Sequence, residues 1–190
     1  MTERTQEEEI HLLQTLNQAI SEAPDFHTAL FITLLQVCEL TGWDYGEAWI
    51  PCKNSRVLEL SPVWYSTPQR IFMGNGTALA IEQFRLCSEA FVLPPALGLP
   101  GRVWSSQQPE WIVDVSAHSE TYFLRNQIAK AYGIKAGFGV PVIVNHQVLA
   151  VLIFFMRQTR KEDQRLIELV AAVAIKLGAI MQHSSVVQVS

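Results

Sequence analysis

The fold is decided by the stretch Gly98-Leu99-Pro100-Gly101-Arg102-Val103-Trp104, which leads into Glu110-Trp111-Ile112-Val113-Asp114. Two glycines bracket Leu-Pro, and glycine adopts backbone angles that side chains forbid, so the chain can turn sharply here. Pro100 suits the first turn of a helix, where its missing N–H is not needed. Arg102 and Trp104 follow on that expected turn. The stretch is therefore typical of the rim of a small-molecule cavity.

Composition limits the classes of function that this chain can have. Its 190 residues suffice for one domain with a sizeable core, and 49% of them are hydrophobic. The net charge is -4 without any run of Lys or Arg, so we expect no nucleic-acid partner. No apolar run approaches the roughly 20 residues of a membrane-spanning helix, and residues 1–9 are too acidic and polar for a secretory signal. The three cysteines are widely spaced, which favours a reduced, cytoplasmic setting.

Amphipathic periodicity predicts long helices at both ends of the chain, over 7–21, 26–40 and 161–183. In the last of these, apolar residues recur at spacings of four and three: Leu166, Val170, Val173, Leu177 and Ile180. This heptad-like stripe suits packing against the chain's own sheet. In its distal part it also suits pairing with the same helix of a second chain.

The middle of the chain alternates strands with short helices. We expect strands over 43–51, 56–66, 111–115, 136–144 and 147–156, with a short helix over 124–132 that Gly133 ends. The last strand is continuously apolar over 148–155, which indicates a central strand covered on both faces. This order of elements fits an α+β fold, in which helices flank an antiparallel sheet.

Taken together, these motifs resemble a GAF domain, the small-ligand sensory module of bacterial signalling proteins. The resemblance covers residues 25–182 and rests on Thr41-Gly42-Trp43, the stretch from Gly98 to Trp104, Trp111-Ile112-Val113-Asp114, Gly139-Val140-Pro141-Val142 and Val148-Leu149-Ala150-Val151-Leu152. It implies a GAF/PAS-like antiparallel sheet of five to six strands, with the N- and C-terminal helices packed together on one face. The chain would divide into an N-terminal helix suited to dimerisation (1–24), the domain core (25–160), and a C-terminal signalling or dimerisation helix and tail (161–190).

The resemblance also implies a ligand cavity between the sheet and residues 91–132. Arg125 begins the short helix that closes this cavity, and a guanidinium group binds carboxylate or phosphate through paired hydrogen bonds. An exposed arginine at a helix start is the alternative, just as Arg102 could pair with a carboxylate to hold its turn. The candidate ligand-binding residues are Phe91, Arg102, Trp104, Asp114, His118, Tyr122, Arg125 and Phe138.

Residues that would support catalysis or a covalent cofactor are missing from their expected places. No cysteine follows Cys87, whereas bilin-binding relatives attach the chromophore through a cysteine before the short helix, so covalent bilin is not expected. Relatives that reduce free methionine sulfoxide carry a thiol in the turn where this chain has Pro100. The cyclic-nucleotide signature cannot be placed in order. His118 with Asp114 and Glu120 could suggest a metal site, although solvated loop residues explain them more simply.

We therefore expect a non-catalytic sensory domain of a two-component type bacterial protein. The resemblance implies a homodimer through the terminal helices, an unidentified small-molecule ligand, and a kinase or cyclase output module, without nucleic acid or membrane as partners. The alternative is a GAF scaffold whose cavity is filled by side chains and which acts only in protein–protein assembly. A void with converging polar groups would favour the sensor, and a packed aromatic interior would favour the scaffold.

Overall fold

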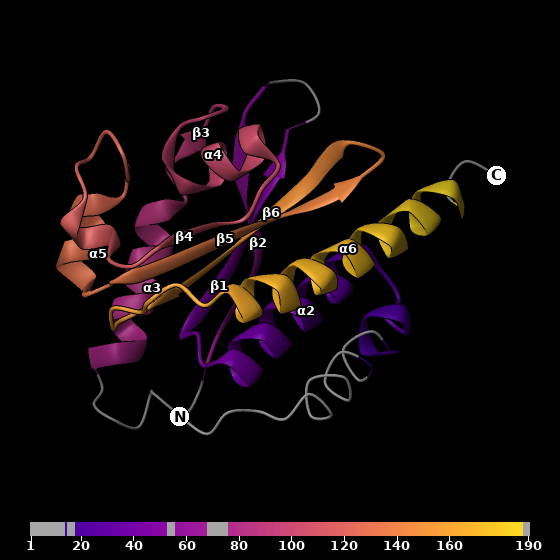
Figure 1. Ribbon diagram of the computed structural model, residues 1–190, viewed down its shortest axis with the longest axis horizontal. Coiled ribbons are helices and arrows are strands. Elements are labelled where there is room, and N and C mark those ends of the chain that lie inside the picture. Colours follow the sequence, from indigo (N-terminus) through magenta and orange to yellow (C-terminus); the bar gives the residue numbers. More distant parts are fainter. Residues whose placement is uncertain (1–13, 15–17, 53–55, 68–75, 188–190) are drawn as a thin grey trace.

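The fold is built around one antiparallel sheet (Figure 1). The computed structural model describes residues 14, 18–52, 56–67 and 76–187, so most of the helix expected over 7–21 lies outside the described residues. The strands are β1 (Tyr45–Pro51), β2 (Leu58–Ser66), β3 (Val92–Leu93), β4 (Glu110–Ile112), β5 (Ala136–Val144) and β6 (Gln147–Met156). They lie in the order β3-β2-β1-β6-β5-β4, and every neighbouring pair is antiparallel. The α+β fold class is confirmed, with six strands.

The hairpin of β5 and β6 matches the sequence-based prediction in both of its strands. Asn145 and His146 join them with positive φ angles of 47° and 64°, as a two-residue hairpin turn requires. β6 pairs with β1 on one side and β5 on the other, so it is central, as its continuous apolar run predicted. β3 was not predicted, because a two-residue edge strand leaves no periodicity to detect.

Helices cover both faces of the sheet (Figure 1). Helices α2 (Phe26–Thr41) and α6 (Gln164–Val187) lie side by side on one face, which confirms the packing together expected of the terminal helices. Helices α3 (Gly76–Ser88), α4 (Gly98–Ser106) and α5 (Asn126–Tyr132) lie on the other, together with the 3-10 turn η2 (Val115–Ala117).

The face under α2 and α6 is the apolar one. Ala48 of β1 and Leu152 and Phe154 of β6 are fully buried there. Helix α6 buries its stripe in the same cluster, with Leu166, Val170, Val173, Ala174 and Leu177 at 7% exposure or less and Ile180 partly covered. The described part of the stripe therefore packs against the chain's own sheet.

The opening stretch forms α4, and its glycines permit close packing. A Cβ on Gly101 would lie 2.5 Å from the carbonyl oxygen of Pro94. A Cβ on Gly139 of β5 would lie 2.8 Å from Val103 Cγ2, because α4 packs directly on this strand. Small residues at these two places let the helix approach the sheet closely.

Candidate functional site

The side chain of Arg125 lies in the interior, between the sheet and helices α3 and α5. Arg125 is the N-cap residue of α5, which begins at Asn126, two residues later than the sequence predicted. Its side chain is only 2% exposed. Because a charged side chain is almost never buried without a partner, its surroundings define the candidate site.

Glu47 of β1 is the partner of Arg125. Its side chain is fully buried, and its Oε1 lies 2.7 Å from Arg125 Nη2. The same oxygen accepts a 2.8 Å hydrogen bond from the indole N–H of Trp49. Strand alternation points Tyr45, Glu47 and Trp49 to this face of the sheet, opposite the face that Ala48 covers. The two charges therefore form a buried ion pair across the interior.

Aromatic rings and one hydroxyl complete the surroundings of the guanidinium. Its Cζ lies 5.0–5.7 Å from the centroids of four rings, which belong to Trp49, Phe84, Phe123 and Phe155. Nη1 of Arg125 donates to Ser88 Oγ at 3.0 Å, and that hydroxyl donates in turn to the carbonyl of Phe84. We call the group of Arg125, Glu47, Ser88, Tyr45 and these four rings the Arg125 centre.

Three polar atoms of the Arg125 centre are incompletely hydrogen-bonded among the described residues. They are Glu47 Oε2, Tyr45 Oη and Arg125 Nη2, and none of them makes a well-aligned hydrogen bond. All three nevertheless contact one another within the centre, because Nη2 lies 2.7 Å from Glu47 Oε1 and the Tyr45 hydroxyl is close enough to the Glu47 carboxylate to donate to it. Burial first, and the Glu47 carboxylate second, raise the pKa of Tyr45 well above its usual value, so its hydroxyl stays neutral. Buried polar atoms are normally fully paired, so this incompletely paired group is the candidate for polar recognition.

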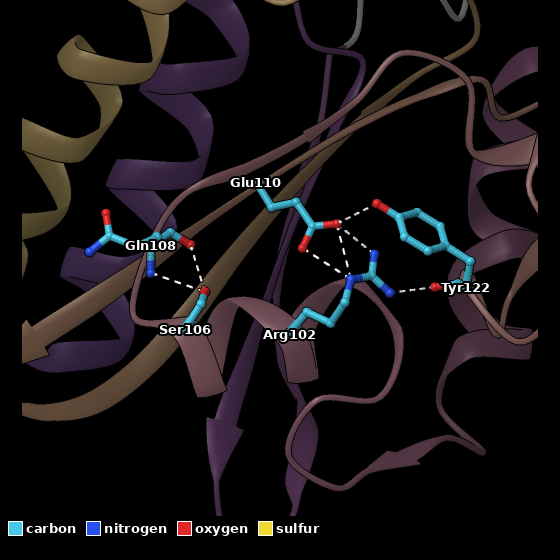
Figure 2. Close-up of polar contacts among 5 residues, drawn as sticks. All are labelled: Arg102, Ser106, Gln108, Glu110 and Tyr122. Carbon is cyan, nitrogen blue, oxygen red and sulfur yellow. Dashed lines mark hydrogen bonds and ion pairs between the residues drawn. The ribbon is translucent and has the colours of Figure 1, made fainter.

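A second polar group lies nearer the surface and holds the segment that carries Arg125 (Figure 2). Arg102 of α4 pairs with Glu110 through Nε, 3.1 Å from both carboxylate oxygens, and through Nη2 at 2.6 Å. It also donates to the backbone carbonyl of Tyr122, and its guanidinium lies 4.0 Å from the centre of the Tyr122 ring. We call Arg102, Glu110 and Tyr122 the latch, since they tie α4 and β4 to the segment over 118–125.

Asn126 holds the same segment from inside. Its side chain is buried, and its Nδ2 lies 2.6–3.2 Å from the carbonyl oxygens of Val115, Ser116 and His118. The backbone of Phe123 and Tyr122 is folded back onto the carbonyl of Ser119. The segment over 118–125 is therefore a turn held by defined contacts. Arg125 is its last residue, and the side chain of Arg125 points into the interior.

The structure brings some of the sequence-predicted site residues together and separates others. Arg125 occupies the centre, and Phe91 and Trp104 are partly buried against the cluster that surrounds it. Arg102 and Tyr122 form the latch, so Arg102 pairs with a carboxylate, as the alternative reading expected; the exposed His118 ring lies 4.5 Å from that of Tyr122.

Asp114 and Phe138 lie away from the centre. Asp114 caps η2, because its Oδ1 accepts hydrogen bonds from the N–H and the hydroxyl of Ser116. Phe138 is fully buried on the α2 and α6 face, stacked between the rings of Trp43 and Phe154. The sheet therefore separates Phe138 from Arg125.

Sequence reasoning missed Glu47, Tyr45, Trp49 and Ser88. The signal was present for one of them, since Glu47 is a lone charge in the otherwise uncharged strand Tyr45-Gly46-Glu47-Ala48-Trp49. A charge at such a position is buried, and a buried carboxylate requires a donor. Nothing in the sequence says which donor that is.

Two further searches bear on the chemistry of the described residues. Within that part of the chain, no group of three or more His, Cys, Asp or Glu side chains could hold a metal ion. None of the helices described there is long and apolar enough to cross a membrane.

Comparisons with known proteins identify the family and the fold. The family model of the GAF domain matches residues 25–179. Protein NLP6 of Arabidopsis thaliana is 25% identical over 182 residues, which cover 86% of this chain and 21% of NLP6. Protein NLP7 of the same organism is also 25% identical, over 74% of this chain and 15% of NLP7. The chain therefore spans about a fifth or less of the curated relatives that it matches.

Solved structures share the fold at low sequence identity. The free methionine-R-sulfoxide reductase of Neisseria meningitidis, in complex with its substrate, superposes with a TM-score of 0.72 at 15% sequence identity. The superposition covers 98% of this chain and 97% of the reductase chain. The GAF domain of an Acinetobacter phosphoenolpyruvate-protein phosphotransferase has a TM-score of 0.70 at 16% identity. That superposition covers 96% of this chain and 98% of the Acinetobacter domain. A GAF domain of a phosphotransferase and a free methionine-R-sulfoxide reductase thus share this fold.

Proposed function

We propose that this chain, which belongs to the GAF domain family, is a non-catalytic sensory domain. It binds a small molecule at the Arg125 centre. The GAF domain is a regulatory, small-molecule-binding fold. Within that description we assign the chain to a cytoplasmic bacterial signalling protein of the two-component type, acting on a kinase or cyclase output module. The observation that carries the proposal is the buried pair of Arg125 and Glu47, whose polar atoms are incompletely hydrogen-bonded.

The cost of the ion pair supports a role in binding. Replacing a buried ion pair by apolar residues of similar volume is often neutral or stabilising, so such a pair is a poor device for stability alone. Arg125 is held inside an aromatic interior, where an apolar side chain would pack equally well. A charged pair at this place is explained by a polar ligand that it recognises.

A chain of contacts leads from the centre to α6. Phe155, whose ring lies 5.0 Å from the Arg125 guanidinium, accepts a backbone hydrogen bond from Asp44 at 3.0 Å. Asp44 Oδ2 accepts from the backbone N–H of Arg157, at the start of the segment that joins β6 to α6. Further along that segment Arg160 lies over Trp43. We propose that ligand occupancy reaches α6 along this path, because it alters packing at its first step.

The dimer of this proposal forms through the outer face of α6. Ile175 is 68% exposed there, and the small exposed residues Ala172 and Ala179 flank it at helical spacing. We expect Ile175→Glu to convert a dimer into a folded monomer in light scattering, whereas the exposed control Lys161→Glu stays dimeric. A dimer that survives Ile175→Glu would exclude this face.

The binding proposal is tested by native mass spectrometry of freshly purified protein, followed by a thermal melting screen with amino acids, nucleotides, haem and bilins. A ligand at about 100 times its Kd adds about 2.7 kcal/mol to the free energy of unfolding, which raises Tm by several degrees. The double variant Arg125→Met/Glu47→Leu should lose that shift. Lys130→Gln, an exposed change on α5, should keep it.

The scaffold function remains the second candidate, since the four aromatic rings pack closely around Arg125. It predicts that no compound co-purifies and that none raises Tm. The double variant would then fold and dimerise like the natural chain, because assembly requires only the surface of the terminal helices.

A further inference from the structure

We propose that the open groove between α2 and the outer edge of β2 binds an extended, positively charged segment of a partner protein, which pairs with β2 as an added strand. The groove has a volume of about 500 Å³. Its lining residues are Phe31 of α2 and Pro62, Val63, Trp64, Tyr65 and Ser66 of β2. It lies on the α2 side of the sheet, whereas the Arg125 centre lies on the other side, so this proposal is independent of the proposed function.

The outer edge of β2 is open along the groove. β3 pairs with β2 only over 58–59, and no other strand of the described residues lies on that side of β2. On the inner side, the backbone N–H of Thr67 donates to the carbonyl of Asp44 at 3.0 Å. Because this direction alternates along a strand, the N–H and C=O groups of Ser66 and Trp64 point outward. These are the groups with which an extended peptide can pair.

Apolar side chains lie beside this edge. Phe31 is 40% exposed, and its ring meets that of Tyr65 edge-on, with the centroids 6.1 Å apart. Val63 is partly buried against the cluster under α2. Unpaired backbone groups next to exposed aromatic surface suit an added strand, since its alternate side chains can enter the groove while its backbone pairs with β2.

The charge of this face favours a basic partner. Glu39 is exposed at the rim of the groove, and its carboxylate accepts a hydrogen bond from the Tyr65 hydroxyl. Burial first, and this hydrogen bond second, raise the pKa of Tyr65, so its hydroxyl stays neutral and the negative charge stays on Glu39. Glu59 is exposed on the same face, because its neighbours Leu58 and Leu60 pack on the opposite one.

Cations are scarce around the groove. Over residues 18–52 and 56–67 the single Lys or Arg is Arg56, which lies roughly 26 Å along the strand from Trp64. Arg85 lies over the Trp64 ring from α3, on the other side of the sheet, and pairs with Glu89. A Lys or Arg side chain of a partner would therefore meet carboxylates and, among the described residues, no competing cation on this face.

A second copy of this chain suits the groove less well. Pairing of β2 with itself would bring Glu39 and Glu59 of one copy toward the same carboxylates of the other, and like charges repel. Pro62, which has no N–H, and the bulge between β1 and β2 interrupt the regular edge. Each copy would then offer only the stretch over 64–66, which is too short for a stable symmetric interface.

The experiment compares two peptides that differ in charge. A fluorescently labelled peptide of alternating Lys and Val, about nine residues long, is titrated with the natural chain beside its Glu and Val counterpart, and binding is followed by anisotropy. We expect the Lys–Val peptide to bind at least about 10-fold more tightly. Glu39→Lys should remove most of this preference. Glu82→Lys, which makes the same change of net charge at an exposed position of α3, should keep it.

A second pair of variants tests the backbone pairing. Ser66→Pro removes the outward N–H and should weaken binding of the Lys–Val peptide at least about 10-fold, whereas Ser66→Ala keeps the N–H and should bind like the natural chain. Circular dichroism checks that both variants fold. If Ser66→Pro does not fold, NMR of the natural chain decides, since the peptide should shift the amide signals of Trp64 and Ser66.

Three outcomes would overturn the proposal. Equal binding of the two peptides would remove the selection for a basic partner. Absence of binding would exclude the added strand, and slow amide exchange at Ser66 would then assign the edge to another segment of this chain. A dimer that Ser66→Pro converts to a monomer in light scattering would assign it to a second copy. None of these results bears on the ligand screen at the Arg125 centre.

Discussion

The same strands form an apolar cluster on one face of the sheet and a buried polar centre on the other. On β1, Ala48 faces α2 and α6 within an apolar cluster, while its neighbours Glu47 and Trp49 face α3 and α5 and build a buried polar centre. The first face removes apolar surface from water, which stabilises the fold. The second face places two charges in the interior, which costs desolvation. Successive side chains of one strand point to opposite faces of the sheet, so a single strand can contribute to the stabilising core on one face and to the polar centre on the other.

The largest expected effect tests the apolar face. Phe154 is fully buried on the α2 and α6 side, where its ring stacks on that of Phe138. Phe154→Ala should lower the free energy of unfolding by about 3–5 kcal/mol, because it removes a large buried ring and leaves a cavity. Urea unfolding followed by circular dichroism measures the change. A loss below about 1 kcal/mol would mean that this face is not the stabilising one.

The next prediction tests the polar face. Arg125→Met should cost about 3 kcal/mol or more, because it leaves the fully buried Glu47 without its cation. Adding Glu47→Leu should recover most of that loss, since no unpaired charge then remains in the interior, although the indole N–H of Trp49 loses its acceptor. The same unfolding assay serves both variants. If the double variant were as unstable as the single one, the ion pair itself would be a source of stability and the contrast between the faces would fail.

Much of the fold was predictable from sequence, because the spacing of apolar residues along the chain indicates which side chains are buried. The β5–β6 hairpin matched over 136–144 and 147–156, since continuous apolar runs separated by Asn145-His146 have few other interpretations. Helix α5 began later than predicted, because Arg125 serves as its cap and turns inward instead of continuing the helix.

The candidate site was predictable only in part. Arg125 stood out by its place before a short helix, but its partner Glu47 lies far away in the chain, and pairing at that distance is set by topology. Phe138 illustrates the other limit. Alternation shows that it faces away from Gly137 and Gly139, but not which side of the sheet carries the ligand compartment.

A smaller effect is expected at Asp114, at the margin of the polar face. Burial acts to raise the pKa of its carboxyl, but the hydroxyl and N–H of Ser116, with Lys135, outweigh it and the pKa is lowered. Asp114→Ala should cost about 1 kcal/mol at pH 7, as the loss of a cap does.

The pH dependence of that effect follows from the sign of the shift. A carboxyl whose pKa is lower in the folded chain than in the unfolded chain stabilises the fold above its unfolded pKa. This contribution is lost as the pH falls through the folded pKa. The difference between the natural chain and Asp114→Ala should therefore be constant near neutral pH and shrink below about pH 4. A difference that grew on acidification would contradict this role.

The smallest effect on global stability is expected at the latch, where the effect on local opening is large. Arg102 and Glu110 are each about a fifth exposed, at 21% and 22%, so Arg102→Gln should change the free energy of unfolding by no more than about 1 kcal/mol. It should nevertheless speed amide exchange at Tyr122 and Phe123, which the latch holds against Ser119.

Ser106→Ala is the matched control for the latch, because Ser106 lies on the same helix and contacts only Gln108 in Figure 2. Its amide exchange over 119–124 should equal that of the natural chain. Faster exchange in Arg102→Gln alone would show that the polar face opens locally while the apolar face stays closed, as a domain that admits a ligand requires. Equal exchange in both variants would mean that the segment carrying Arg125 is held by Asn126 from inside, and that the latch does not control access to the centre.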